Sequence, residues 1–195
     1  MKKITALVLT LVLMISALAG CGDSGADSSG GEDGVKSLSF SLLAAPTSLD
    51  PATTTDGQSL MVENQLYSML VNSKCGNSAE IEPDIATSWK ISDDELTYTF
   101  TLRDDVYFHN GEKMTAQDVV YTFERVMVEP YTSYLAVMID SVEAPDDTTF
   151  IAHLKYPFAD FLTTIGTNYF GICCEEAITS GPDFMYHPVG TGPYR

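Results

Sequence analysis

Hydrophobic and polar residues alternate or recur with clear periods over most of the chain. In residues 96–103, large apolar residues alternate with threonine and arginine, which predicts a strand with one buried face. Trp89 and Ile91 belong to a predicted partner strand, joined to the first through residues 92–95. In residues 37–42, leucine and phenylalanine alternate with serine, which predicts a half-buried opening strand.

Helical spacing of apolar side chains predicts a helix over residues 56–71, followed by a loop over residues 72–77. A second helix is predicted to begin after Thr115. Thr115 and Asp118 have the spacing of a capping box, in which each side chain can bond the backbone near the other. Pro130 is expected to stop this helix, because proline lacks the N–H that a continuing helix needs.

Further strands and short helices complete the pattern. Strands are predicted over residues 138–143 and 149–154, on either side of a turn signal, and short helices over residues 158–164 and 175–180. Asn110-Gly111 predicts a tight turn, because both residues accept positive φ angles. The sequence therefore predicts the α/β class, with helices and mixed sheets in an α+β arrangement.

The amino-terminal residues follow a different pattern. Residues 4–19 are almost entirely apolar and follow a basic start, as in an export signal, and they are too few for the ~20 residues that span a bilayer. The run ends in Leu-Ala-Gly-Cys, which resembles a bacterial lipobox and predicts that residues 1–20 are a lipoprotein signal peptide. Cleavage then precedes Cys21, whose thiol is acylated. An ordinary signal peptide with a chance cysteine is the alternative. Residues 21–34 predict a flexible tether of mostly Gly, Ser and Asp.

Composition narrows the class of partner. The 195-residue chain carries a formal net charge of -17, so nucleic acid is excluded as an expected partner because a polyanion would be repelled. Besides Cys21 there are Cys75, Cys173 and Cys174. In an exported protein, Cys75 can form a disulfide with one of the adjacent pair, or all three can be buried or free thiols. The sequence leaves both readings open.

The chain has no recognisable catalytic motif. There is no nucleophile elbow and no phosphate loop, and His109, His153 and His187 lack metal-ligand spacing, so we expect no catalytic residue, no metal and no cofactor. His109 is interpreted as a polar residue beside a turn, and His153 as a solvated residue on a strand. The motif at residues 190–192 is interpreted as a tight backbone crossing rather than an anion cradle, because Pro193 lacks an N–H.

Four motifs resemble one family. Residues 98–121, YTFTLRDDVYFHNGEKMTAQDVVY, resemble the signature of the family 5 solute-binding proteins of ABC importers, which bind dipeptides, oligopeptides or nickel. Three further motifs occur along the chain in the same order as in the family: SLDP at 48–51, PDIATSW at 83–89 and PVGTGPY at 188–194. In the second of these, isoleucine replaces the family's leucine. The resemblance covers residues 38–195.

The resemblance implies a periplasmic-binding-protein-like class II fold, in which two α/β lobes close on a ligand. It places the amino-terminal part of the solute-binding domain at residues 35–195. Within it, residues 35–52 and 163–195 are expected to form the core of the first lobe, and residues 53–162 an inserted subdomain. Family members are much longer, so we expect an amino-terminal fragment with an incomplete first lobe and no second lobe.

The resemblance also implies a function. The expected protein is not an enzyme but the extracytoplasmic substrate-binding component of an ABC importer, with a small peptide or other small solute as ligand and ABC permease subunits as partners. Lipidated Cys21 would anchor it to the bacterial cell membrane. The expected ligand-binding segment, whose backbone pairs with a peptide by strand addition, is Leu43, Ala44, Ala45 and Pro46. Without a second lobe, binding is expected to be weak or absent. A surface peptide sensor for signalling, or a nickel, sugar or heme binder of the same family, is the alternative.

Overall fold

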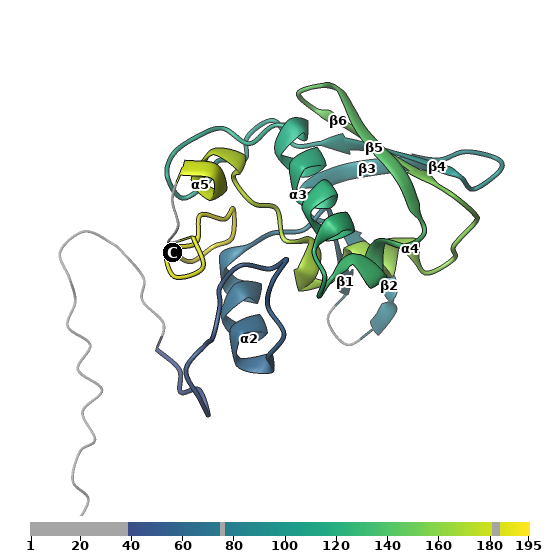
Figure 1. Cartoon of the computed structure of the whole chain (residues 1–195). Helices are drawn as coiled ribbons and strands as arrows, with labels where there is room; N and C mark the ends of the chain where they lie inside the picture. Colours follow the sequence, from purple (N-terminus) through teal and green to yellow (C-terminus); the bar gives the residue numbers. More distant parts are fainter. Residues whose placement is uncertain (1–38, 75–76, 181–183) are drawn as a thin grey trace, which may run out of the picture. The chain divides into compact units, whose positions relative to one another are not determined.

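The structure, a computed structural model, describes residues 39–74, 77–180 and 184–195 (Figure 1). Leu42–Arg195 forms one compact unit, the second along the chain, and every helix and strand of the described residues belongs to it. None of the helices in these residues is both long enough and apolar enough to cross a membrane. The predicted signal peptide and tether lie outside the described residues.

The second unit combines short helices with two antiparallel sheets, which confirms the predicted mixed α/β class. Its elements in chain order are α2 (Gly57–Leu66), β1 (Val71–Lys74), β2 (Asn77–Pro83), β3 (Ala86–Ile91), β4 (Thr97–Leu102), α3 (Ala116–Val128), the 3₁₀ helix η1 (Ser133–Ala136), β5 (Ile139–Asp146), β6 (Thr149–Leu154), α4 (Phe161–Ile165), the 3₁₀ helix η2 (Asn168–Phe170) and α5 (Glu175–Ser180).

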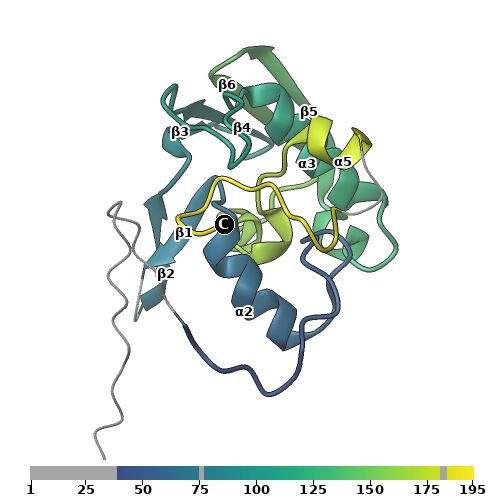
Figure 2. The ribbon, with the colours of Figure 1, turned by 90° about the vertical axis from the view of Figure 1, so that its left-hand side faces the viewer.

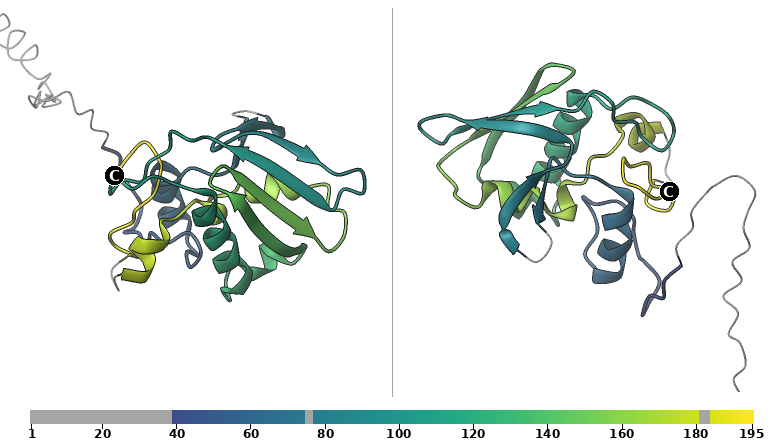
Figure 3. Two further views of the ribbon diagram at one scale, coloured as in Figure 1. Left: turned by 90° about the horizontal axis from the view of Figure 1, so that it is seen from above. Right: turned by 180° about the vertical axis from the view of Figure 1, so that it is seen from behind.

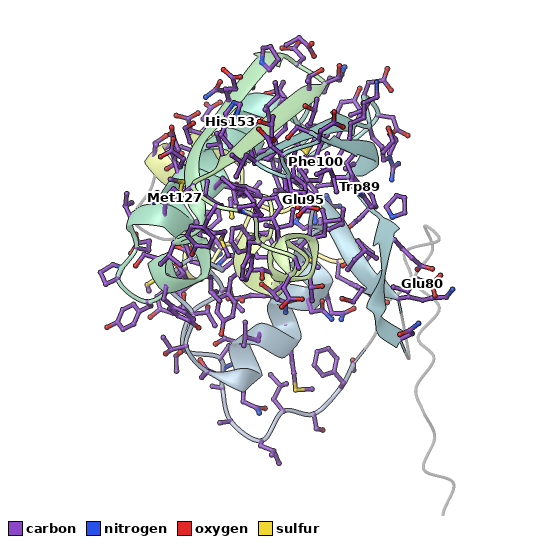
Figure 4. The ribbon with its side chains drawn as sticks, turned by 90° about the vertical axis from the view of Figure 1, so that its right-hand side faces the viewer. Glu80, Trp89, Glu95, Phe100, Met127 and His153 are labelled. Atoms are coloured by element: carbon purple, nitrogen blue, oxygen red, sulfur yellow. The ribbon has the colours of Figure 1, made fainter. Side chains whose placement is uncertain are left out.

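The larger sheet has the strand order β3-β4-β6-β5 (Figure 3). On β4, Tyr98, Phe100 and Leu102 are buried, whereas the threonines between them are partly or fully exposed. Phe100 pairs with Trp89 of β3, and their ring centroids lie 6.4 Å apart (Figure 4). The strand predicted over residues 96–103 and its partner strand are therefore confirmed.

The second half of the sheet also follows the sequence pattern. β5 and β6 pair as an antiparallel hairpin, and β5 extends beyond its predicted end to Asp146, which pairs with Thr149. The strands predicted over residues 138–143 and 149–154 are confirmed. The predicted short helices are present as α4, which begins later than expected, and α5.

α3 covers one face of this sheet (Figure 1). Thr115 is its N-cap, and the Thr115 N–H donates to Asp118 Oδ2 at 2.9 Å, which is the carboxylate half of the predicted capping box. Phe123 points inward and is fully buried, with its ring centroid 4.7 Å from that of Phe150 and 5.0 Å from that of Phe170. These aromatic contacts join the helix, the sheet and η2 into one hydrophobic core.

The helix predicted over residues 56–71 is wrong in its last turn, because α2 ends at Leu66. Tyr67, the C-cap, is already extended, and Ser68 and Met69 bond to distant segments instead of to the helix. The carbonyl of Ser68 accepts the N–H of Ile172 at 3.0 Å. Apolar spacing continues past Leu66 because these residues are buried, but their burial comes from tertiary pairing and not from a helical face.

The loop predicted over residues 72–77 is also wrong in part. β1 and β2 form a hairpin there, with Val71 paired to Pro83 and Asn72 to Glu82. Local signals for this hairpin are weak, because its strands carry few β-branched residues.

The opening strand predicted over residues 37–42 is not found in its described part, since residues 39–42 belong to no strand; residues 37 and 38 lie outside the described residues. A strand is stable only when a partner satisfies its backbone N–H and C=O groups. No ladder among the described residues includes this segment. The expected buried face is not found either, since Phe40 is 50 % exposed and Leu42 is only half-buried.

Residues 188–194 cross the carboxyl end of α2 at close range (Figure 2). The Gly192 N–H donates to the carbonyl oxygen of Leu66 at 2.8 Å. A Cβ atom on Gly190 would stand 2.1 Å from that same oxygen, so a side chain cannot be accommodated. The tight backbone crossing predicted for this motif is confirmed.

Candidate functional site

The predicted ligand-binding segment is joined to the amino end of α2. The Leu43 N–H donates to Gln58 Oε1 at 3.0 Å. The Leu43 side chain is 98 % exposed, Ala44 and Ala45 are also exposed, and Pro46 is half-buried. The backbone groups of Ala44 and Ala45 bond to no residue that the structure describes. A short piece of exposed backbone is thus held in place while its own N–H and C=O groups stay available.

Asp56, the N-cap of α2, fixes the other end of this segment. Its Oδ1 accepts the N–H groups of Gln58 at 3.0 Å and Ser59 at 2.9 Å, and its Oδ2 accepts the Ser59 hydroxyl at 2.6 Å. The Ser59 oxygen in turn accepts the Thr47 N–H at 3.0 Å. The hydrogen bond from the Ser59 hydroxyl, together with those from Thr47 and the helix backbone, holds the pKa of Asp56 well below its ordinary value.

The SLDP motif lies directly after this segment and is tied to α3. The Asp50 carboxylate receives two hydrogen bonds from Arg125, at 3.0 and 2.7 Å. Burial by itself would lower the pKa of Arg125, but the contact with Asp50 outweighs it and raises the pKa. Tyr67 donates its hydroxyl to the carbonyl of Leu49 at 2.7 Å. The motif is therefore an anchor for the loop and does not present its carboxylate to solvent.

Glu63 is a further buried acid beneath the same loop. It lies in α2, is fully buried and contacts the hydroxyl of Thr54 through Oε1. Burial raises the pKa of Glu63 to about 7. Sequence reasoning missed both Glu63 and the Asp50–Arg125 pair. For Glu63 a signal was present, because position 63 lies three residues from both Leu60 and Leu66 and so shares their apolar face.

The three histidines do not come together. His153 lies on the outward face of β6, with Nε2 3.3 Å from Glu143 Oε1, in keeping with a solvated residue (Figure 4). His187 is exposed near the carboxyl terminus. Within residues 39–74, 77–180 and 184–195, no three His, Cys, Asp or Glu side chains are grouped to hold a metal ion.

His109 does more than flank a turn, so its interpretation from sequence was incomplete. Its N–H donates to the Gly190 carbonyl at 3.0 Å, and its Nε2 lies 2.8 Å from the Gly192 carbonyl oxygen. Because that oxygen can only accept, Nε2 carries the hydrogen, and Nδ1 is left to accept the Gly190 N–H at 3.4 Å. His109 thereby holds the crossing segment through contacts that are separate from those with α2. No local pattern could reveal a pair separated by 81 residues.

The described cysteines are not reactive groups. Cys173 and Cys174 are free thiols and are both buried. Burial raises the pKa of each thiol, so neither is a ready nucleophile at neutral pH. Cys75 and Cys21 lie outside the described residues.

Comparison with known proteins identifies the family. A family model described as "Bacterial extracellular solute-binding proteins, family 5 Middle" matches residues 80–195. The chain belongs to this family. The match contains the signature at residues 98–121 and the PVGTGPY motif, so the resemblance drawn from those motifs is confirmed.

Individual relatives of this family 5 chain differ in their ligands. Heme-binding protein A of Haemophilus influenzae is 34 % identical over 95 % of this chain and 40 % of its own length. The probable D,D-dipeptide-binding periplasmic protein DdpA of Escherichia coli is 35 % identical over 80 % of this chain and 32 % of its own. These relatives are binding proteins and not enzymes.

A solved structure supports the predicted class II fold. The periplasmic binding protein DppA from Helicobacter pylori, in complex with the peptide STSA, aligns with a TM-score of 0.70 and 36 % sequence identity. The alignment covers 78 % of this chain and 35 % of DppA. The chain thus spans roughly a third of the length of the relatives that it matches.

Proposed function

We propose that this chain is the amino-terminal part of the extracytoplasmic substrate-binding component of an ABC importer, with a small peptide as the favoured solute. The observation that carries the proposal is the exposed backbone of Ala44 and Ala45, held at both ends by Gln58 and by the Asp56–Ser59 pair. An extended peptide can add to such a backbone as a strand, because main-chain groups on both sides then satisfy each other.

Residues 43–46 suit a ligand of varied sequence. Backbone hydrogen bonds do not depend on the peptide's side chains, so affinity from this segment is general and selectivity must come from other parts of the protein. The Leu43 side chain, 98 % exposed, adds an apolar surface that an incoming side chain can cover. Peptide ligands are also named for two of the relatives above.

The proposed arrangement places the binding lobe outside the cytoplasm on a lipid tether. Acylated Cys21 would hold the chain on the bacterial cell membrane, with residues 21–34 as the flexible spacer. Residues 35–52 and 163–195 would belong to the first lobe and residues 53–162 to its inserted subdomain. Metabolic labelling with a palmitate analogue tests the anchor. The label should appear on the wild-type protein and be absent from Cys21→Ala, and equal labelling of both would refute lipidation at this cysteine.

We expect this chain alone to bind peptides weakly, because a ligand held from one side keeps much of its surface in water. In an NMR titration with a mixture of tetrapeptides, amide shifts should change at residues 43–46, with a dissociation constant of about 1 mM or weaker. Micromolar or tighter binding would contradict the one-sided site. Shift changes confined to other parts of the chain would contradict the segment itself.

Two variants make the titration specific. Ala45→Pro removes one N–H from the exposed backbone and should abolish the shift changes. Ala45→Ser keeps this N–H and is the matched control, so it should leave peptide binding unchanged. Heme is the second candidate solute, because heme-binding protein A aligns with 95 % of this chain. Binding of heme with no response to peptides would favour it.

A further inference from the structure

Glu63 lies in surroundings that disfavour an ionised carboxylate. It is 0 % exposed. Among the described residues, its Oε2 is the buried side-chain oxygen or nitrogen that has no hydrogen-bond partner. Its other oxygen contacts the hydroxyl of Thr54. A carboxylate here would lose its hydration and regain one hydrogen bond, whereas a neutral acid leaves only a carbonyl oxygen unpaired.

The hydrogen count around Thr54 also favours a neutral acid. The Thr54 hydroxyl has a single hydrogen and lies 3.0 Å from the carbonyl oxygen of Asp50. That carbonyl oxygen can only accept. When the hydroxyl donates to Asp50, the hydrogen shared between Thr54 and Glu63 must come from Glu63. A protonated Glu63 supplies it and completes a chain of two hydrogen bonds from α2 to the loop backbone.

Charges around Glu63 point the same way. The carboxylates of Asp50 and Asp56 lie on the preceding loop and oppose a further negative charge. The titratable groups that face this region from the other packed elements are Tyr67, Tyr169, Cys173 and Arg125. The two phenols and the thiol bring no positive charge. The one cation of this set, Arg125, is already bonded to Asp50.

We propose that Glu63 is a positioning residue, which as a neutral acid holds residues 47–54 in place and which loosens them when it ionises. The loop it holds follows directly on residues 43–46. Loss of the proton would therefore disorder the segment to which we assign solute pairing, and this consequence rests on the proposed function. Burial and the neighbouring carboxylates raise the pKa of Glu63 to about 7, so the change falls near neutral pH.

The first test needs neither a ligand nor a variant of uncertain stability. The carboxyl carbon of Glu63 is followed by ¹³C NMR in the 195-residue chain as the pH is raised. We expect Glu63 to titrate near pH 7, well above the value of about 4.3 for a glutamate in an unfolded chain. A midpoint at that ordinary glutamate value would overturn the proposal. Hydrogen exchange of residues 47–54, corrected for its intrinsic pH dependence, should accelerate several-fold through the same midpoint.

The variant Glu63→Gln tests whether ionisation of Glu63 is what loosens residues 47–54. The glutamine amide can donate to the Thr54 hydroxyl at every pH, so the accelerated exchange of residues 47–54 should disappear in this variant. The matched control Glu124→Gln should retain it. If Glu63→Gln keeps the transition, or if Glu63 titrates without any change in exchange, Glu63 does not position the loop. No peptide is used, so a failure of peptide binding would leave this result unaffected.

Discussion

Arg125 of α3 and Asp50 of the SLDP motif form a bidentate salt bridge between residues 75 positions apart in the sequence, with nitrogen–oxygen distances of 3.0 and 2.7 Å. The two side chains are only 15 % and 10 % exposed. The geometry uses both terminal nitrogens of the guanidinium, which a lysine cannot reproduce. The pair therefore joins the loop after the candidate binding segment to the helix that covers the main sheet.

Removing one partner of this pair should destabilise the fold strongly. Arg125→Ala leaves a buried carboxylate without its cation, and we expect a loss of about 3 kcal/mol in the free energy of unfolding. Arg125→Lys should recover only part of this loss, because a lysine ammonium cannot form both parallel hydrogen bonds to Asp50. Urea unfolding followed by circular dichroism measures the change. The matched control is Arg103→Ala, whose partner Asp105 is exposed, and it should have little effect. If both variants lose the same free energy of unfolding, the buried Arg125–Asp50 pair stabilises the fold no more than an exposed pair does.

Glycine at positions 190 and 192 should prove indispensable. A Cβ on Gly192 would lie 2.5 Å from the Leu66 carbonyl carbon, and the other nearest atoms are also backbone atoms of Gln65 and Leu66, so no flexible side chain can yield. We expect Gly192→Ala to cost about 2 kcal/mol or more through overpacking. Gly57→Ala is the control, since no atom lies within 4 Å of its Cβ position. In a thermal melt, Gly57→Ala should be neutral or stabilising, because alanine favours a helix. Tolerance of Gly192→Ala would mean that the crossing is looser than described.

His109 should control the mobility of the crossing segment. Loss of its ring removes the hydrogen bond to the Gly192 carbonyl, while the backbone bond to Gly190 can remain. His109→Ala is expected to cost about 1 to 2 kcal/mol and to speed hydrogen exchange at residues 188–194. His153→Ala, on the outer face of the sheet, should do neither. If hydrogen exchange at residues 188–194 is unchanged in His109→Ala, the contacts with α2 alone hold this segment in place.

Sequence patterns predicted the parts of the fold that depend on local chemistry. In β4 the alternation of residues 97–102 matches one buried face, and Asp118 caps α3 through a contact three residues away. The errors lie where distant partners decide. Residues 39–42 have the alternation of a strand but pair with no strand that the structure describes, and Ser68 lies beyond the end of α2 and bonds to Ile172.

For the candidate site, the sequence analysis predicted a segment of the chain but not the contacts that hold that segment in place. The family resemblance suggested residues 43–46 as a binding segment, and a motif marked the SLDP loop, yet nothing in the sequence linked Asp50 to its partner Arg125. A carboxylate and a guanidinium far apart in sequence have no period that links them. Glu63 was open to prediction, because its place among Leu60 and Leu66 implies burial, but its protonation depends on Asp50 and Asp56 being near.

Asp56 should make the order of residues 43–47 depend on pH in the acid range. Its carboxylate accepts hydrogen bonds from the Ser59 and Thr47 hydroxyls and from two helix N–H groups, so its pKa is lower in the folded state than the value of about 3.9 in an unfolded chain. The stabilisation is complete above the unfolded pKa and is lost as the pH falls through the folded pKa.

Asp56→Asn tests this assignment, because asparagine can still cap a helix but has no charge to titrate. The difference in melting temperature between wild type and Asp56→Asn should be largest near neutral pH and shrink as the pH is lowered below about 4. Asp94→Asn is the control. Asp94 also has a lowered pKa, from hydrogen bonds within the β3–β4 turn, but it does not touch residues 43–47. Exchange at Leu43 and Thr47 should therefore rise in Asp56→Asn and stay at the wild-type rate in Asp94→Asn. The same rise in both variants would mean that Asp56 acts through overall stability and not by holding the segment.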